Sequence, residues 1–182
     1  MIEVEIKAKI EDNIAAYEKI KEIGGVYSHS EKQHDIYFNG ENKDFKESDE
    51  ALRIREVPDG EDLKRILTYK GPKLDTETKT RKEIEVTVDN TENLIEILVN
   101  IGFRPSAIVN KMRRIFTYED YTITVDKLNK LGYFIEIEYV TSEESDIDEI
   151  QKNIFSIFEK LGIKDGFVKT SYLELLEENK DK

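Results

Sequence analysis

Positively charged side chains recur at two-residue spacing in this 182-residue sequence. Arg53 is followed by Arg55, and Lys111 by Arg113, with one apolar residue inside each pair. A triphosphate carries about four negative charges near neutral pH, and arginine can grip phosphate oxygens through two hydrogen bonds. The candidates for binding such a polyanion are Arg53, Arg55, Lys70, Arg81, Lys111 and Arg113.

Negatively charged side chains show the same spacing. Carboxylates two residues apart on a strand point to one face, and Mg²⁺ and Mn²⁺ prefer oxygen ligands. The sequence contains no cysteine, which excludes thiolate metal sites. The candidate ligands of a divalent cation are therefore Glu3, Glu5, Glu136 and Glu138, with Asp126 as a further candidate. Glu83 and Glu85 could ligate metal or pair with arginines, and we favour pairing.

Charged and apolar residues alternate through these segments, which predicts strands with one charged and one apolar face. Such a charged face commonly lies in solvent above a packed core. Here, however, some strands carry only basic pairs and others only glutamate pairs, unlike the mixed composition of a solvated face. Helices with apolar stripes must cover the other face of the sheet. We therefore predict an α+β fold in which eight antiparallel strands form a closed barrel, with charged residues inside and helices packed outside.

The periodicity places the elements that must position these residues. Strands are expected near residues 2–9, 26–39, 50–57, 63–70, 81–88, 107–118, 121–127 and 132–140. Helices are expected near 11–24, 91–101, 145–161 and 169–178. Each half of the chain has four strands and one helix after its first strand. An internal duplication follows, with Gly102 lying 78 positions after Gly24 and Glu83 lying 80 after Glu3.

Composition limits the class of protein. The length predicts a single domain over residues 1–182. No apolar run has the length of a membrane span, and the charged alternation from residue 2 leaves no room for a signal peptide, so we expect a cytoplasmic protein without a membrane partner. A net charge of −12 argues against a nucleic-acid partner, although it can hide a local basic site.

An ordered series of short motifs extends across nearly the whole chain and begins with the N-terminal Glu3-x-Glu5-x-Lys7. The series continues through Asp35-Ile-Tyr37-Phe38, Leu52-Arg53-Ile-Arg55, Thr68-Tyr69-Lys70-Gly71-Pro72, Arg81-x-Glu83-x-Glu85, Lys111-x-Arg113, Asp126 and Leu131-Gly132-Tyr133-Phe134-Ile135-Glu136-Ile137-Glu138. This series resembles the CYTH superfamily, the triphosphate tunnel metalloenzymes, and its first motif is similar to the signature of that superfamily.

This resemblance implies a role for each matching position. It implies an eight-stranded tunnel in which basic residues hold a triphosphate and acidic residues hold Mg²⁺ or Mn²⁺. The implied substrate-binding residues are Lys7, Arg53, Arg55, Lys70, Arg81, Lys111 and Arg113. The implied metal ligands are Glu3, Glu5, Glu136 and Glu138, and the implied catalytic residues are Glu3, Glu5, Lys7 and Asp126. The resemblance also suggests a homodimer.

Three functions remain open from the sequence. Chain length and the terminal Ser171-Tyr172-x-x-Leu175-Leu176 look most like class IV adenylyl cyclases, which convert ATP to cyclic AMP and pyrophosphate. The same tunnel could instead hydrolyse inorganic, thiamine or nucleoside triphosphates. A non-catalytic polyphosphate-binding module ranks last, because it would not need four alternating glutamates. Asp35 is expected to support a tunnel arginine.

Overall fold

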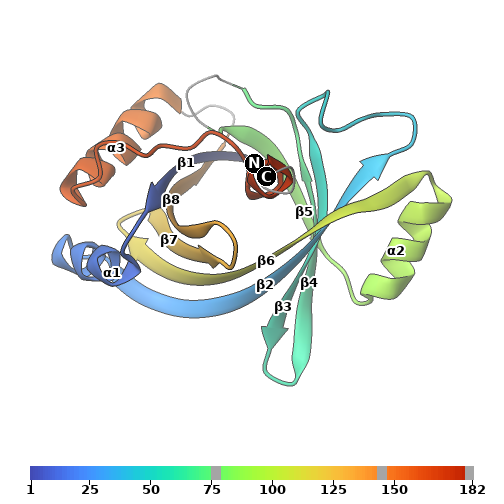
Figure 1. Cartoon of the computed structure of the whole chain (residues 1–182), viewed down its shortest axis with the longest axis horizontal. Helices are drawn as coiled ribbons and strands as arrows, with labels where there is room; N and C mark the ends of the chain where they lie inside the picture. Colours follow the sequence, from blue (N-terminus) through green and yellow to red (C-terminus); the bar gives the residue numbers. More distant parts are fainter. Residues whose placement is uncertain (75–78, 143–146, 179–182) are drawn as a thin grey trace.

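Eight antiparallel strands close into a barrel in the computed structural model of the chain, which describes residues 1–74, 79–142 and 147–178 (Figure 1). Around the barrel the strands follow the order β1-β5-β4-β3-β2-β6-β7-β8. Their bounds are β1 Ile2–Ile10, β2 Val26–Gly40, β3 Ala51–Asp59, β4 Asp62–Lys70, β5 Arg81–Thr87, β6 Phe103–Tyr118, β7 Tyr121–Leu128 and β8 Gly132–Thr141. The predicted α+β barrel is confirmed.

In each half of the chain one helix follows the first strand, and the two helices begin and end alike. Helix α1 (Asn13–Glu22) begins after Asp12, whose carboxylate accepts from two backbone N–H groups. Helix α2 (Thr91–Asn100) begins after Asn90, whose side chain accepts from Asn93 N. Both are followed by a glycine with positive φ, 99° at Gly24 and 96° at Gly102, a conformation that favours glycine.

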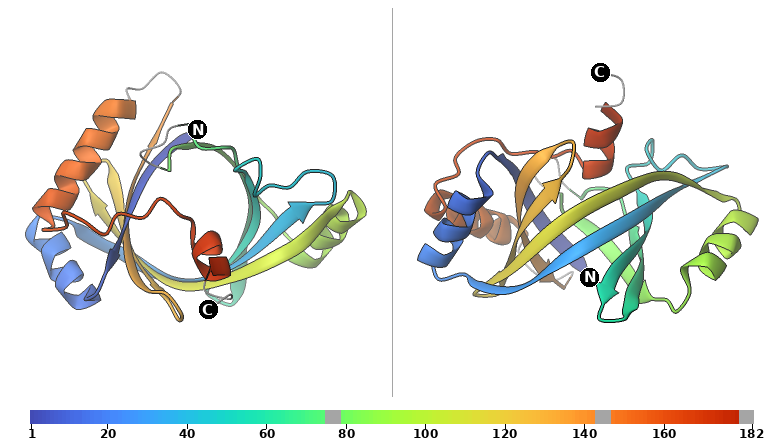
Figure 2. Two further views of the ribbon diagram at one scale, coloured as in Figure 1. Left: turned by 45° about the horizontal axis from the view of Figure 1, so that its top comes forward. Right: turned by 60° about the horizontal axis from the view of Figure 1, so that its bottom comes forward.

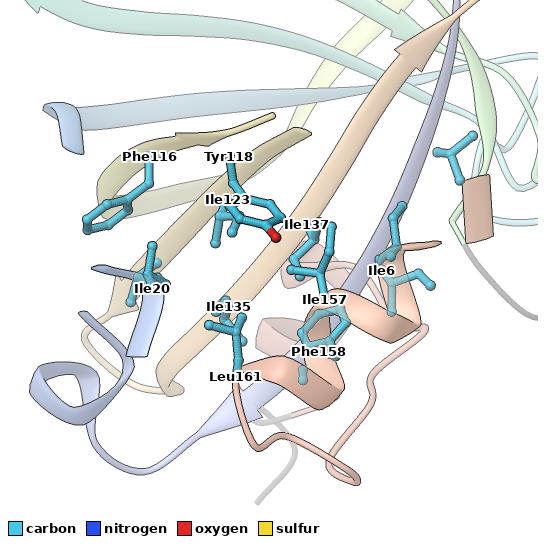
Figure 3. Close-up of a cluster of buried hydrophobic side chains, with 14 of the residues drawn as sticks. Ile6, Ile20, Phe116, Tyr118, Ile123, Ile135, Ile137, Ile157, Phe158 and Leu161 are labelled. Carbon is cyan, nitrogen blue, oxygen red and sulfur yellow. The ribbon is translucent and has the colours of Figure 1, made fainter. Parts of the chain in front are cut away.

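The apolar faces of the strands point outward, against helices. The largest core cluster joins β1, β6, β7 and β8 to α1 and α3 (Ile147–Lys160), and Figure 3 shows Ile20 and Phe158 packed against the outer faces of these strands. Helix α2 covers the opposite side, where Leu98 packs near Ile54. Figure 2 shows α1 and α3 on one side of the barrel and α2 on the other. Inward charges such as Glu5 and Glu136 are thus backed by outward apolar neighbours on the same strand, Ile6 and Ile137.

Helix α4 (Tyr172–Glu178) departs from the expected arrangement. Helices were predicted to lie outside the barrel, but Tyr172, Leu173 and Glu174 line its interior cavity. The segment before α4 is held along β1, where Lys9 N donates to Gly166 O (2.9 Å) and Val168 N donates to Lys7 O (2.8 Å). This pairing carries the chain over one end of the barrel, where Figure 1 shows α4 near its centre.

Some element bounds also differ from the predicted ones. Strand β6 begins at Phe103 rather than near 107, because it pairs with β2 as far as Gly40. Residues 145 and 146 of the predicted third helix lie outside the described residues, as do the last four residues of the chain. None of the helices in the described ranges combines the length and the hydropathy that crossing a lipid bilayer requires.

Candidate active site

A cavity of about 430 Å³ occupies the barrel interior. Twelve of the charged residues singled out in the sequence line it, and they come from β1, β3, β4, β5, β6 and β8. These residues are Glu3, Glu5, Arg53, Arg55, Lys70, Arg81, Glu83, Glu85, Lys111, Arg113, Glu136 and Glu138. Lys7 and Asp126 are more deeply buried, at 1% and 0% exposure, and do not border the cavity.

Arg113 is the centre of an ion-pair network on β6, β7 and β8. Its guanidinium donates to both oxygens of Asp126 (2.7 and 2.6 Å), and it also pairs with Glu136 and with Glu138 (3.4 Å). Burial opposes ionisation of Asp126, but Arg113 and then Lys111 outweigh it and lower the pKa of that carboxyl. Asp126 is therefore ionised and binds the Arg113 guanidinium on the side away from the cavity, which fixes the orientation of Arg113 toward the cavity.

Lys111 belongs to the same network. Its ammonium donates to Asp126 (3.1 Å), and it is 7% exposed. Burial and the neighbouring Arg113 lower the pKa of Lys111 to about 8, against the attraction of Asp126. A bound polyanion would raise the pKa of Lys111 again, because nearby negative charge favours the charged ammonium.

The neighbouring strands β2 and β3 contain a second arginine held by a buried acid. Asp35 on β2 accepts two hydrogen bonds from Arg55 on β3, both 2.7 Å, and lies 3.6 Å from Arg53. Burial opposes ionisation of Asp35, but Arg53 and Arg55 outweigh it and hold its pKa well below the ordinary range. The expectation that Asp35 supports a tunnel arginine is confirmed.

Carboxylates crowd together where β1 meets β5. Glu3 lies 3.2 Å from the ammonium of Lys70, which also pairs with Glu83. Burial and the nearby Glu3 raise the pKa of Glu83 to about 8, and the same two causes raise the pKa of Glu138 well above its ordinary value. Glu83 thus pairs with a lysine, while Glu85 lies 3.8 Å from Arg53.

Arg81 is held from outside this crowded region. It donates to the backbone oxygens of Asp49 (2.7 Å) and Gly71 (3.0 Å), and to the Asp49 carboxylate (3.0 Å). The loop between β2 and β3 therefore fixes one of the predicted substrate-binding arginines at the edge of the cavity. Asp49 was not singled out in the sequence, because it lies in a turn-rich segment without alternation.

Lys79 was not singled out in the sequence, and Tyr172 was named only in the terminal motif, without a place in the cavity. Lys79 lines the cavity and pairs with Glu5 (2.8 Å); its position two residues before Arg81 was an available signal. The ring of Tyr172 lies 3.9 Å from the Lys7 ammonium and 4.8 Å from that of Lys111. Burial and the neighbouring Lys79 lower the pKa of Lys7 to about 6, against the attraction of Glu136 and Glu5.

Comparison with known proteins shows the family to which a chain with this barrel belongs. The CYTH domain profile matches residues 1–172. The chain belongs to the CYTH family. The resemblance drawn from the motifs is thereby confirmed.

Three relatives of this CYTH protein illustrate the match. A Methanocaldococcus jannaschii protein named "Putative adenylate cyclase" is 42% identical over 176 residues, which cover 96% of this chain and 98% of the relative. The adenylate cyclase CyaB of Aeromonas hydrophila is 25% identical over 150 residues, 81% of this chain and 74% of the relative. The structure of the PH1819 protein of Pyrococcus horikoshii superposes with a TM-score of 0.89 at 38% identity, covering 97% of this chain and 99% of that one.

CYTH tunnel enzymes use divalent metal ions, and the carboxylates of this cavity are the groups of the chain that could hold one. Within the described ranges, no three acidic or histidine side chains already converge as a metal-binding group. Carboxylate oxygens of the cavity glutamates form ion pairs with Lys70, Lys79 and Arg113 instead. The donor set nevertheless fits a hard cation, because Glu3 is hydrogen-bonded to both Glu83 and Glu138, and burial and this neighbouring carboxylate raise the pKa of both groups despite their basic partners.

Proposed function

We propose that this CYTH protein is a divalent-metal-dependent adenylyl cyclase that converts ATP to cyclic AMP and pyrophosphate. The observation that carries the triphosphate assignment is the cavity itself, which is lined by arginines and lysines from both halves of the barrel. Six glutamates of the strands line the same space: Glu3, Glu5, Glu83, Glu85, Glu136 and Glu138. The name of the relative that is 42% identical favours a cyclase over a triphosphatase.

The charged residues would exchange partners when the substrate binds. In the structure these cations pair with carboxylates of the cavity wall, such as Lys70 with Glu3 and Lys79 with Glu5. Phosphate oxygens would take over these ammonium groups, and the released carboxylates would then hold the metal. Arg55 and Arg113 would keep their buried partners and so remain oriented while they contact phosphate.

In the proposed reaction the ribose 3′-hydroxyl loses its proton to solvent, and its oxygen forms a new bond to the α-phosphorus of ATP. The bond from the α-phosphorus to the bridging oxygen breaks, and pyrophosphate leaves with that oxygen. A bound metal ion would neutralise phosphate charge and lower the pKa of the 3′-hydroxyl. The residues of this chain contribute by fixing the triphosphate and by stabilising negative charge on the leaving pyrophosphate, for which Arg113 and Lys111 lie on one strand.

Product analysis tests this function. Purified protein with ATP and Mg²⁺ or Mn²⁺ is expected to release cyclic AMP and pyrophosphate in equal amounts. Orthophosphate with ADP, or far faster turnover of tripolyphosphate than of ATP, would replace the cyclase by a triphosphatase.

A matched pair of variants on β4 links the activity to the cavity. Lys70→Met removes a cavity-lining ammonium and is expected to lower turnover about a hundredfold. Lys64→Met changes an exposed lysine of the same strand and should leave turnover unchanged. Equal activity of the two variants would exclude the cavity as the site.

A further inference from the structure

The outer surface of the barrel is covered unequally on its two sides. Helices α1 and α3 pack into one core cluster on one side, whereas no described helix lies beside α2 on the other (Figure 2). Equivalent residues of the two halves lie 78 positions apart, as Gly24 after α1 and Gly102 after α2 do. Residues near α3 can therefore be compared with their counterparts near α2.

In the first half, α3 covers the outward face of β1. Ile6 and Ala8 of this face are 4% and 0% exposed, and they belong to the same core cluster as Ile157 and Phe158 of α3. Ile23, which follows α1, packs against that cluster. The apolar surface of β1 and α1 is thus buried by a helix of the same chain.

The counterparts of these three residues in the second half are apolar but lie in solvent. They are Ile84, Val86 and Ile101, which are 53%, 50% and 64% exposed. On β4 the cross-strand neighbours of Ile84 and Val86 are Tyr69 and Leu67, so one apolar surface, here called the β4–β5 face, comprises these four strand residues. A strand face that remains in solvent is normally polar, and a contiguous exposed apolar patch marks an interaction surface.

Helix α2 carries the kind of surface that can cover such a face. Ile97 is 56% exposed and lies four residues before Ile101, so the two residues form an exposed apolar stripe, here called the α2 stripe. Charge also fits a contact between β5 of one copy and α2 of another. The exposed Lys82 of β5 and the exposed Glu96 of α2 have opposite signs.

We infer that a second copy of the chain covers the β4–β5 face, in a twofold contact that places the α2 stripe of each copy against the β4–β5 face of the other. A twofold contact uses the same surface of both partners, so that surface must be self-complementary. The strand face and the helical stripe together meet this requirement. The inference concerns the outside of the barrel and does not depend on the activity proposed for its interior.

Sedimentation equilibrium of the full chain tests the inference. The wild type is expected to associate to twice the 21.3 kDa mass of one chain. Ile84→Glu and Ile101→Glu place a carboxylate in the face and in the stripe, and each should raise the dissociation constant of the dimer at least about tenfold. Both positions are exposed in a single copy, so the circular dichroism of the monomer should stay that of the wild type.

Ile108→Glu is the matched control, since Ile108 is a strand residue of β6 with a similar exposure of 56% and lies outside the β4–β5 face. This variant should associate like the wild type. A wild-type mass of 21.3 kDa at every concentration, or undiminished association of both Ile84→Glu and Ile101→Glu, would overturn the inference. Equal weakening by Ile108→Glu would overturn it as well, because the contact would then not be specific to this face.

Discussion

The two halves of the barrel share one topology but distribute charge differently. The halves comprise β1–β4 with α1 and β5–β8 with α2, and exchanging them reproduces the same strand order around the barrel. The strand register aligns them with an offset of 78, since Glu3 pairs with Arg81 and Gln33 with Lys111. This register corrects the alignment of Glu3 with Glu83 suggested by residue type, and it places Gln33 and Lys111 at equivalent positions of the two halves.

A buried acid–arginine pair occurs in both halves with its charges exchanged. In the first half the carboxylate is Asp35 on β2 and the guanidinium is Arg55 on β3. In the second half the guanidinium is Arg113 on β6 and the carboxylate is Asp126 on β7. Both halves thus hold an acid–arginine pair on their second and third strands, but the strand that carries the acid in one half carries the arginine in the other. The barrel therefore constrains where the charges lie more tightly than which strand carries each sign.

The two acid–arginine pairs differ mainly in how many carboxylates pair with the arginine. Among the described residues, Asp35 is the one carboxylate in an ion pair with Arg55, whereas Arg113 also pairs with Glu136 and Glu138. The raised pKa of Glu138 means that this group can ionise further if a neighbouring negative charge is lost. We therefore expect the second half to tolerate the loss of its buried aspartate better than the first half.

The largest expected effect comes from neutralising the two aspartates. Asp35→Asn should lower the free energy of unfolding by about 3–5 kcal/mol, because it leaves Arg55 without its ion-pair partner. Asp126→Asn should cost only about 1–2 kcal/mol, because Glu136 and Glu138 still neutralise Arg113. Urea unfolding at pH 7 measures both. A cost for Asp126→Asn that equals or exceeds that of Asp35→Asn would show that the network is not redundant.

The pH dependence of stability tests whether the cost of Asp35→Asn comes from the lost charge. Because the pKa of Asp35 is lowered in the folded protein, its stabilising contribution is fully present above the ordinary value of 3.8 and is lost as pH falls toward the folded pKa. The difference in stability between wild type and Asp35→Asn should therefore shrink below about pH 4. A constant difference across this range would assign the cost to packing rather than to charge.

The sequence predicted the barrel well because its signals are local. Alternation in segments such as 2–9 fixes which side chains share a face, and that information does not depend on distant contacts. The depth of each residue is a different matter. Lys7 lies beneath Tyr172, a residue 165 positions away, and no local pattern indicates that α4 covers the cavity. Asp126 alternates like a cavity residue but is shielded by the Arg113 and Lys111 side chains.

A medium effect is expected from two neighbouring glutamates of β8. Both Glu136→Gln and Glu138→Gln should lower Mn²⁺ affinity, measured by calorimetry with a non-hydrolysable triphosphate, and turnover together. Their stabilities without metal should differ. Glu136→Gln removes a partner of Arg113 and should cost about 1.5–3 kcal/mol. Glu138→Gln relieves repulsion with Glu3 and should leave the protein as stable as wild type or more so.

The stability gained by Glu138→Gln should grow with pH. A carboxyl whose folded pKa is raised binds a proton that the unfolded chain has already lost, so the wild type loses stability as pH rises above 4.5 toward the folded pKa. The glutamine variant lacks this penalty. Unchanged metal affinity in both variants would make these glutamates structural partners of Arg113 rather than ligands.

The smallest expected effect concerns the aromatic contact that Tyr172 of α4 makes with one lysine from each half, Lys7 on β1 and Lys111 on β6. The Tyr172 ring lies within cation–π distance of Lys7 and Lys111, and its buried hydroxyl has no hydrogen-bond partner among the described groups. Tyr172→Phe keeps the ring and removes the unpaired hydroxyl, so it should be as stable as wild type. Tyr172→Leu removes the ring and should cost about 1 kcal/mol relative to Tyr172→Phe. Thermal unfolding of the two variants isolates this difference. Equal stability of the leucine and phenylalanine variants would mean that Tyr172 contributes through packing alone, and that the lysines beneath it are held by their carboxylate partners.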